Sequence, residues 1–203
     1  MATKPGRRPR SAEQIQETRA KIVSTALTLF QEEGYDAVSI RRLAKDVGCA
    51  PMTIYAHFAG KIEILQHLWA VVLDKVFAEI KSDLEAASTP QERLRSASHR
   101  FVNYWLEHPD HFRMVFMSND IARNDVGSFI HTDGTQAHFK VFHDLVATVL
   151  AGEADVKVVT DTLIIAMIGN AFCFNTIADY PWTDALKLVD STLSGMVPGY
   201  TNY

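Results

Sequence analysis

Two adjacent arginines, Arg41 and Arg42, stand where a cation is unfavourable unless it binds an anion. They fall in the first turn of an expected helix, where the positive end of the helix macrodipole favours acids over cations. A guanidinium group matches the geometry of a phosphate and of the guanine edge, so contact with nucleic acid would make both positions favourable. The alternative is an ordinary solvated helix face. We expect at least one of the two arginines to contact DNA.

A second cluster of polar side chains follows a few residues later. Met52 and Thr53 offer a thioether and a methyl group that can contact the methyl group of thymine, and Lys61 can approach a phosphate as a point charge. Tyr55 has a hydroxyl that can donate a hydrogen bond to a phosphate, or it can be buried in a helical core. The helix carrying Met52, Thr53 and Tyr55 is short and polar, so its exposed face is expected to bind a partner, and Lys61 lies near the start of the next helix.

The local sequence places both clusters on a helix-turn-helix. Ser39 is a suitable N-cap, and apolar residues recur at helical spacing until Gly48, which favours the left-handed conformation that ends a helix. After a short turn, Pro51 suits the first position of a second helix. Ile54 and Phe58 are spaced to pack that helix against the first one. In such a motif the second helix enters the major groove of DNA.

This stretch resembles the N-terminal domain of TetR-family transcriptional regulators. The resemblance rests on Thr53, the run Tyr55–Phe58, Lys61 after a short gap, and the run Gly34–Ala37 before the motif. It implies that Tyr55 contacts a phosphate. Ala50 stands where the family often has Ser or Thr, so the second helix lacks the usual side-chain cap, at a cost of about 1 kcal/mol. We expect the DNA-contacting residues to be Ser39, Arg41, Arg42, Pro51, Met52, Thr53, Tyr55, His57 and Lys61.

Charge is distributed unevenly along the chain of 203 residues, whose net charge is −4. Residues 1–65 carry ten Lys or Arg and seven Asp or Glu, a net +3, whereas residues 66–203 carry ten and seventeen, a net −7. A basic end on an acidic body suits a protein that presents one end to phosphates. The basic, proline-rich residues 4–10 can order in the minor groove of DNA or form a disordered solubilising tail, and both alternatives stay open.

Other features bound the class of protein. Cys49 and Cys173 are lone cysteines in different regions, so we expect no structural disulfide and a cytoplasmic location. The N-terminus lacks the apolar segment of a secretory signal, and the longest strongly apolar run, Leu163–Ile168, is too short to span a membrane. The sequence contains no Gly-rich phosphate loop, no nucleophile elbow and no zinc-protease motif, so we expect no enzymatic activity.

Apolar residues recur at helical rather than alternating spacing throughout, which predicts an all-α fold. Thr89, Pro90 and Glu92 form a strong helix start with a capping box. We expect a DNA-binding domain over residues 1–60 and a helical ligand-binding and dimerisation domain over residues 61–203. Outside the motif, the expected helices are Ala12–Glu33, Gly60–Ala87, Pro90–Glu107, Pro109–Met117, Thr135–Leu150, Asp155–Ala178 and one starting at Pro181. The residues of Ala12–Glu33 expected to face inward are Ile15, Ile22, Val23, Ala26, Leu27 and Phe30. We expect a polar loop over residues 118–134.

The segment Asp155–Ala178 is apolar around nearly its whole circumference, so it must be buried on more than one side. Other helices of the chain can cover one side, and a second copy of the chain covers the other most simply. We therefore expect a homodimer through a four-helix interface made by the last two helices. The alternative is a deep core within one chain.

The second domain also holds side chains suited to an apolar pocket. The TetR resemblance implies that a small molecule binds in this domain and releases DNA by changing the spacing of the two DNA-binding heads. Large aromatic side chains with a few polar groups suit such a pocket, although each residue taken alone fits core packing better. The expected pocket residues are Phe101, Tyr104, Trp105, His108, Phe112, Phe116, Phe139, Phe142, Asn170, Phe172 and Phe174.

We expect neither a metal site nor a cofactor. His108 and His111 flank Pro109, and the spacing of His138 and His143 is poor for one face of a helix. The sequence therefore predicts a repressor that binds double-stranded DNA at a palindrome and is released by a small-molecule effector. The alternative is a DNA-binding regulator or architectural factor without such a ligand.

Overall fold

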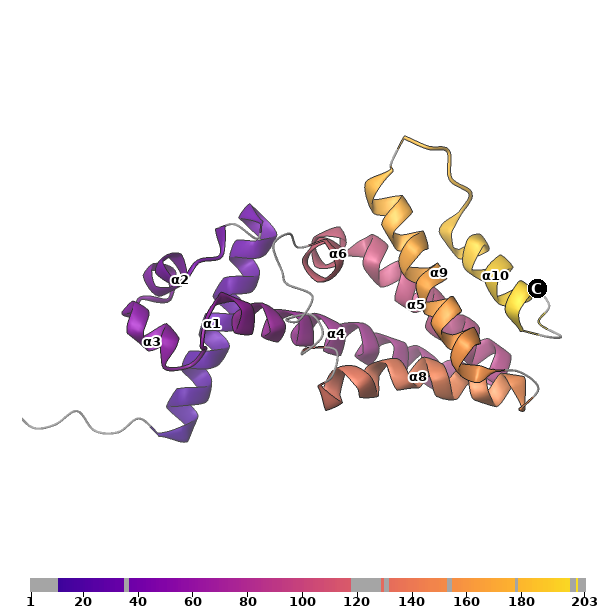
Figure 1. The fold of residues 1–203 in the computed structure, drawn as a ribbon, viewed down its shortest axis with the longest axis horizontal. Coiled ribbons are helices and arrows are strands. Elements are labelled where there is room, and N and C mark those ends of the chain that lie inside the picture. The colour runs from indigo at the N-terminus through magenta and orange to yellow at the C-terminus, as the bar shows by residue number, and fades with distance from the viewer. Residues whose placement is uncertain are drawn as a thin grey trace, which may run out of the picture. The chain divides into compact units, whose positions relative to one another are not determined.

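The computed structural model describes residues 11–34, 37–117, 129, 132–152, 155–177, 179–197 and 200. Within these residues the protein is built from α-helices and contains no β-strand, which confirms the all-α prediction (Figure 1). Contacts divide the chain into two compact units, residues 1–68 and 69–203. The basic residues 4–10 lie outside the described part of the chain.

The first unit begins with helix α1, Ala12–Glu33, which has the predicted bounds. Its start is a capping box, because the Ser11 hydroxyl accepts a hydrogen bond from Gln14 N while the Gln14 side chain accepts one from Ser11 N. Its end is Gly34, which has a φ of 84°. Both ends of α1 are therefore set by local interactions.

Burial along α1 differs in part from the prediction, and Val23 and Leu27, which were expected to face inward, are half-buried. Ile15 was expected to face inward but is 41% exposed, because all the residues from Ser11 to Glu17 are exposed and the first turns of the helix have no packed neighbour among the described residues. Leu29 was not expected in the core and is buried. The buried residues of α1 are Ile22, Ala26, Leu29 and Phe30.

Helices α2, Ile40–Val47, and α3, Pro51–Tyr55, form the predicted helix-turn-helix. The Ser39 hydroxyl accepts a hydrogen bond from Arg42 N at 3.3 Å, which confirms Ser39 as the N-cap. Gly48 has φ 79° and ψ 38°, the left-handed conformation predicted for the end of α2. The start of α3 has no side-chain cap, so this helix depends on its neighbours.

Helix α4, Lys61–Ala86, contributes residues to both units. Its first two turns belong to the first unit, where Ile64, Leu65 and Leu68 are buried. The two units therefore divide within α4, whereas the sequence placed the domain boundary at the start of this helix, between residues 60 and 61. A helix shared in this way leaves no linker whose composition could mark the boundary.

Helix α5, Pro90–Glu107, is the centre of the second unit and lies among its other helices (Figure 1). Its predicted capping box is present, since Thr89 Oγ1 accepts from Glu92 N at 3.1 Å and the Glu92 carboxylate accepts from Thr89 N at 2.9 Å. Besides α4, which meets α5 through an ion pair between Asp83 and Arg100, the helices in contact with α5 are α6, Pro109–Phe116, α8, Asp133–Leu150, α9, Val156–Thr176, and α10, Ala185–Met196.

The last helix starts later than predicted, at Ala185 instead of Pro181. Asp184 decides the position, because its carboxylate accepts hydrogen bonds from the backbone amides of Leu186 and Lys187, both at 3.0 Å. A side chain that satisfies two free amides is a stronger start signal than a proline, which only fits the first turn.

Helix α8 starts at Asp133, earlier than the predicted Thr135, because Thr132 serves as its N-cap. Most of the polar loop expected over residues 118–134 lies outside the described residues. Phe129 is described, and it is buried with its ring centroid 5.1 Å from that of Trp69. This part of the chain therefore contributes at least one side chain to the core.

Charged side chains join α10 to α5. Arg95 donates two hydrogen bonds to the Asp190 carboxylate, at 2.8 and 2.7 Å, and His99 Nε2 lies 2.8 Å from the same group. The Arg95 guanidinium holds the pKa of Asp190 below its usual value. Tyr200 donates to Asp190 at 3.4 Å, and burial raises the pKa of Tyr200 to about 12. Asp190 therefore anchors the C-terminal part of the described chain.

Helix α9 leaves an apolar stripe exposed. Val158, Ile165 and Phe172 recur at every seventh residue, and they are 58%, 70% and 43% exposed. The alternative of a deep core within one chain is therefore wrong. By length and composition α9 could also cross a membrane, which the run Leu163–Ile168 alone did not suggest. Its other side packs against α5, α8 and α10, as a core helix of a globular unit does.

We expect the substitution Gly48→Ala to lower the free energy of unfolding by about 1 kcal/mol, because a side chain is strained at this positive φ. The added methyl group would meet no atom within 4 Å, so strain is the main cost. Gly195→Ala in α10 is the control, since its φ is not positive and alanine favours a helix. Urea unfolding followed by circular dichroism compares the two, and equal stabilities would contradict the assignment.

Candidate nucleic-acid interface

Helix α3 has one buried face and one exposed face. Ile54 and Phe58 are 0% and 1% exposed, as predicted for the residues that pack against α2. Pro51, Met52 and Tyr55 are exposed on the other face, Met52 at 74% and Tyr55 at 50%. The alternative that Tyr55 is buried in the core is therefore wrong, and its hydroxyl is accessible to a partner.

The two arginines of α2 differ in what they bind. Arg41 is exposed, and no partner for its side chain is found among the described residues. Arg42 donates hydrogen bonds to Glu33 at 2.8 and 3.3 Å and to Asp46 at 2.8 Å. Arg42 would have to give up these ion pairs to reach a phosphate, so Arg41 is the better candidate for DNA contact.

The other predicted contact residues surround this face. Ser39 is exposed, with its hydroxyl engaged in the cap of α2, and Thr53, His57 and Lys61 are half-buried. None of the nine predicted residues is fully buried, and all of them belong to the first unit. Every one of them therefore presents some surface to solvent.

Arg19 of α1 holds the end of α3 in place. Its guanidinium donates to the carbonyl oxygen of His57 at 2.6 Å and lies 4.3 Å from the centroid of the Phe58 ring. It also lies 3.4 Å from the Glu63 carboxylate and contacts the His67 ring. One side chain thus joins the turn after α3 to the first turns of α4.

Sequence reasoning missed Arg19, Lys21 and Glu63 as supports of the motif. Lys21 Nζ donates to Val47 O at 2.9 Å, a free carbonyl at the end of α2, and Glu63 accepts from Ala59 N at 2.6 Å. A cation is favourable at a helix C-terminus. Lys21 lies 26 residues from its partner, so no local pattern could have pointed to it.

The second unit brings most of the predicted pocket residues into one aromatic network. Its centre is Trp105, whose ring centroid lies 5.9, 5.3, 6.0 and 5.1 Å from those of Phe101, Tyr104, Phe112 and Phe116. Ring contacts extend the network to Phe77, Phe139, Phe142 and Phe172. Such packing is equally suitable for a core and for the wall of an apolar pocket.

An unsatisfied hydrogen-bond donor lies at the centre of this network. Trp105 is fully buried, and its Nε1 has no hydrogen-bond partner among the described residues. Leaving a buried donor without a partner costs about 1–3 kcal/mol. Trp69 provides a contrast, because its Nε1 donates to Met114 O at 2.9 Å. A bound molecule with an acceptor at Trp105 would remove that cost.

Three predicted pocket residues lie at or beyond the edge of the network. The ring of His108 lies 4.6 Å from that of Tyr104, at the edge. Asn170 Nδ2 donates to the backbone of Ala185 at 2.9 Å, and Phe174 packs on Trp182 at 6.0 Å. The structure thus separates Asn170 and Phe174 from the other predicted pocket residues.

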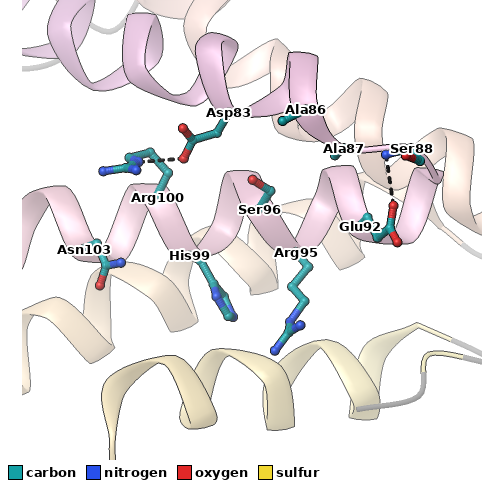
Figure 2. A pocket seen from close by; sticks show the side chains of 10 residues that line it. All are labelled: Asp83, Ala86, Ala87, Ser88, Glu92, Arg95, Ser96, His99, Arg100 and Asn103. Carbon is teal, nitrogen blue, oxygen red and sulfur yellow. Dashed lines mark hydrogen bonds and ion pairs between the residues drawn. The ribbon is translucent and has the colours of Figure 1, made fainter. Parts of the chain in front are cut away.

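A polar pocket of about 570 Å³ lies between the end of α4 and α5, where none was predicted. Figure 2 shows Arg100 turned towards Asp83, which it meets at 2.7 Å, while Arg95 and His99 point to the other side of α5. There both of them meet Asp190. The arginines of this pocket are therefore already paired with carboxylates.

Comparison with known proteins identifies the first unit. The family model for bacterial regulatory proteins of the tetR family matches residues 22–68, which include α2 and α3. The HTH-type transcriptional repressor KstR2 of Mycobacterium tuberculosis is 31% identical over 86 residues, or 42% of this chain and 43% of that protein. The chain thus spans less than half the length of this relative.

Solved structures share the fold of nearly the whole chain. PfmR of Thermus thermophilus, a TetR family transcriptional regulator, has a TM-score of 0.61 at 22% identity, covering 89% of this chain and 99% of that one. FadR of Bacillus subtilis, solved in complex with stearoyl-CoA, has a TM-score of 0.66 at 17% identity, covering 90% and 99%. The match to residues 22–68 confirms the resemblance of the helix-turn-helix region to the tetR family of bacterial regulatory proteins, and the solved structures share the fold of nearly the whole chain.

Proposed function

We propose that this protein is a transcriptional regulator that binds double-stranded DNA through α2 and α3. The exposed face of α3 is the observation that carries the proposal, because Met52 and Tyr55 take no part in the core. We assign base contacts to Met52 and Thr53 and phosphate contacts to Tyr55, Arg41 and Lys61. Base contacts read the sequence in the major groove, and phosphate contacts fix the position of the helix.

We infer that the protein acts as a symmetric homodimer. The exposed stripe of Val158, Ile165 and Phe172 on α9 supports this, because apolar area buried against a second copy stabilises the pair by roughly 25 cal/mol per Å². Two recognition helices read two half-sites about 34–36 Å apart, so the expected target is an inverted repeat. The relative KstR2 is named as a repressor, and repression is our proposal for this chain.

We also propose that an apolar small molecule with a hydrogen-bond acceptor binds in the aromatic network of the second unit. The Nε1 of Trp105, for which the described part of the chain offers no acceptor, supports this assignment. FadR of Bacillus subtilis holds stearoyl-CoA, and this provides a first probe. The effector would favour a dimer that no longer matches the DNA, so affinity for DNA falls by population shift. The alternative is a regulator without a ligand.

We expect Tyr55→Phe to weaken binding to a selected genomic DNA fragment roughly tenfold, because it removes a hydroxyl that donates to a phosphate. Arg41→Ala should reduce the slope of log K against log salt by about 0.9, the contribution of one phosphate. The control Arg93→Ala removes an exposed arginine of α5 and should change neither quantity. Fluorescence anisotropy over a salt series measures both, and wild-type values for both variants would refute the proposed surface.

We expect Ile165→Asp to convert the dimer into a monomer, because it places a charge in the exposed stripe that would face the second copy. Ile165 is 70% exposed within one chain, so the change should not unfold the chain. Ile15→Asp, at an exposed isoleucine of α1, is the matched control. Light scattering gives the mass of each variant. A monomeric wild type, or a dimeric Ile165→Asp, would remove this interface from the proposal.

We expect a true effector to raise the melting temperature of the full chain by mass action. The screen covers long-chain acyl-CoA thioesters, beginning with stearoyl-CoA, together with apolar acids. The shift should shrink in Trp105→Phe, which lacks the indole donor, and persist in Trp69→Phe, whose donor already has a partner. If no compound shifts the melting temperature, or if both variants respond alike, the alternative without a ligand at Trp105 is favoured.

A further inference from the structure

Three side chains able to bind a metal ion lie together where α5 meets α6. The ligand atoms of His108, Asp110 and His111 are all within 4.8 Å of one another. His108 is both the C-cap of α5 and the N-cap of α6, and Pro109 begins α6. Side chains on a helix tilt towards its N-terminus, which brings the His111 imidazole back towards His108. In the sequence, Pro109 between the two histidines was a reason to expect no shared metal site. In the structure, Pro109 lies in the turn that brings His108 and His111 together.

His111 is held in a single orientation. It is 4% exposed, and its Nδ1 lies 2.9 Å from the Tyr104 hydroxyl. A histidine that binds a metal ion commonly has a hydrogen bond at its other ring nitrogen, which fixes the orientation of the imidazole. The second ring nitrogen of His111, Nε2, lies 3.8 Å from the Asp110 carboxylate. The buried imidazole is thus turned towards the second ligand.

The other two ligands are less buried than His111. His108 is half-buried, and the Asp110 side chain is 27% exposed. Bonds of about 2.0–2.2 Å to a tetrahedral ion require ligand atoms roughly 3.3–3.5 Å apart. Binding of an ion would therefore draw the three ligand atoms closer together than the 4.8 Å within which they already lie.

Within the described part of the chain, two sources of positive charge oppose a cation here. The start of α6 carries the partial positive charge of a helix N-terminus, and the field of Lys75 reaches His111. Asp110 lies in the first turn of α6 and brings a full negative charge, which exceeds the partial charge of the helix. Two imidazoles with one carboxylate suit zinc and its neighbours in the periodic table better than magnesium or calcium, which prefer all-oxygen sites.

We propose that His108, Asp110 and His111 bind one divalent ion of the zinc, cobalt and nickel class, with Tyr104 as the positioning residue for His111. Three protein ligands leave a fourth position for water or for an acceptor group of a small molecule. The ion would connect His108, the C-cap of α5, to the first turn of α6. This proposal does not depend on DNA binding.

The test uses the full chain without an affinity tag, stripped with a chelator and dialysed against Zn²⁺ or Co²⁺. We expect elemental analysis to give one ion per chain, and the cobalt form to show a visible four-coordinate spectrum. His108→Gln and Asp110→Asn should each weaken binding about tenfold or more. His143→Gln is the matched control, because His143 also lies beside an aspartate, at 3.5 Å from Asp144, and its loss should change nothing.

Tyr104→Phe should shift the cobalt spectrum while far-UV circular dichroism stays unchanged, as expected of a positioning residue. Binding well below one ion per chain, equal affinity in the wild type and both ligand variants, or an equal loss in His143→Gln would each overturn the proposal. Circular dichroism of every metal-free variant checks folding. If His108→Gln does not fold, His108→Asn takes its place, and Asp110→Asn decides independently.

Discussion

Burial of Ile54 and Phe58 is the constraint on which the DNA-binding surface depends. Helix α3 has only five residues, whereas an isolated helix needs about 12–15 to be even marginally stable in water. Its stability must therefore come from these two side chains and from Arg19, which holds the turn that follows. Substitution of these supporting residues would therefore unfold α3 and displace its exposed residues, although none of the exposed residues is itself changed.

Local signals explain why much of the fold could be predicted. The ends of α1 and α5, the left-handed Gly48 and the start of α3 at Pro51 depend on neighbours within a few residues, and they lie where expected. The start of α10 was missed because Asp184 outcompetes the earlier proline. The exposure of Ile15 depends on which helices reach it, which periodicity along one helix does not reveal.

The exposed face of the candidate site could be predicted from the sequence, whereas the residues that support it could not. Helical spacing separates Tyr55 from Ile54 and Phe58, so which face is open follows from sequence alone. The supports bring together residues from different helices, as in the ion pair of Arg42 with Glu33 and the contacts of Arg19. No local sequence pattern predicts such contacts. The same holds for His108 and His111, whose proximity results from the geometry of a turn.

The division of α3 into an exposed face and a buried face also affects how the target of such a protein can change during evolution. Met52, which we propose to contact bases, is exposed and Thr53 is half-buried, whereas Ile54 and Phe58, which pack against the rest of the first unit, are buried. If the proposed contacts hold, a substitution at Met52 can alter which target is preferred while the first unit keeps its stability. A duplicated copy could acquire a new target by drift at a few surface sites, without first rebuilding its interior.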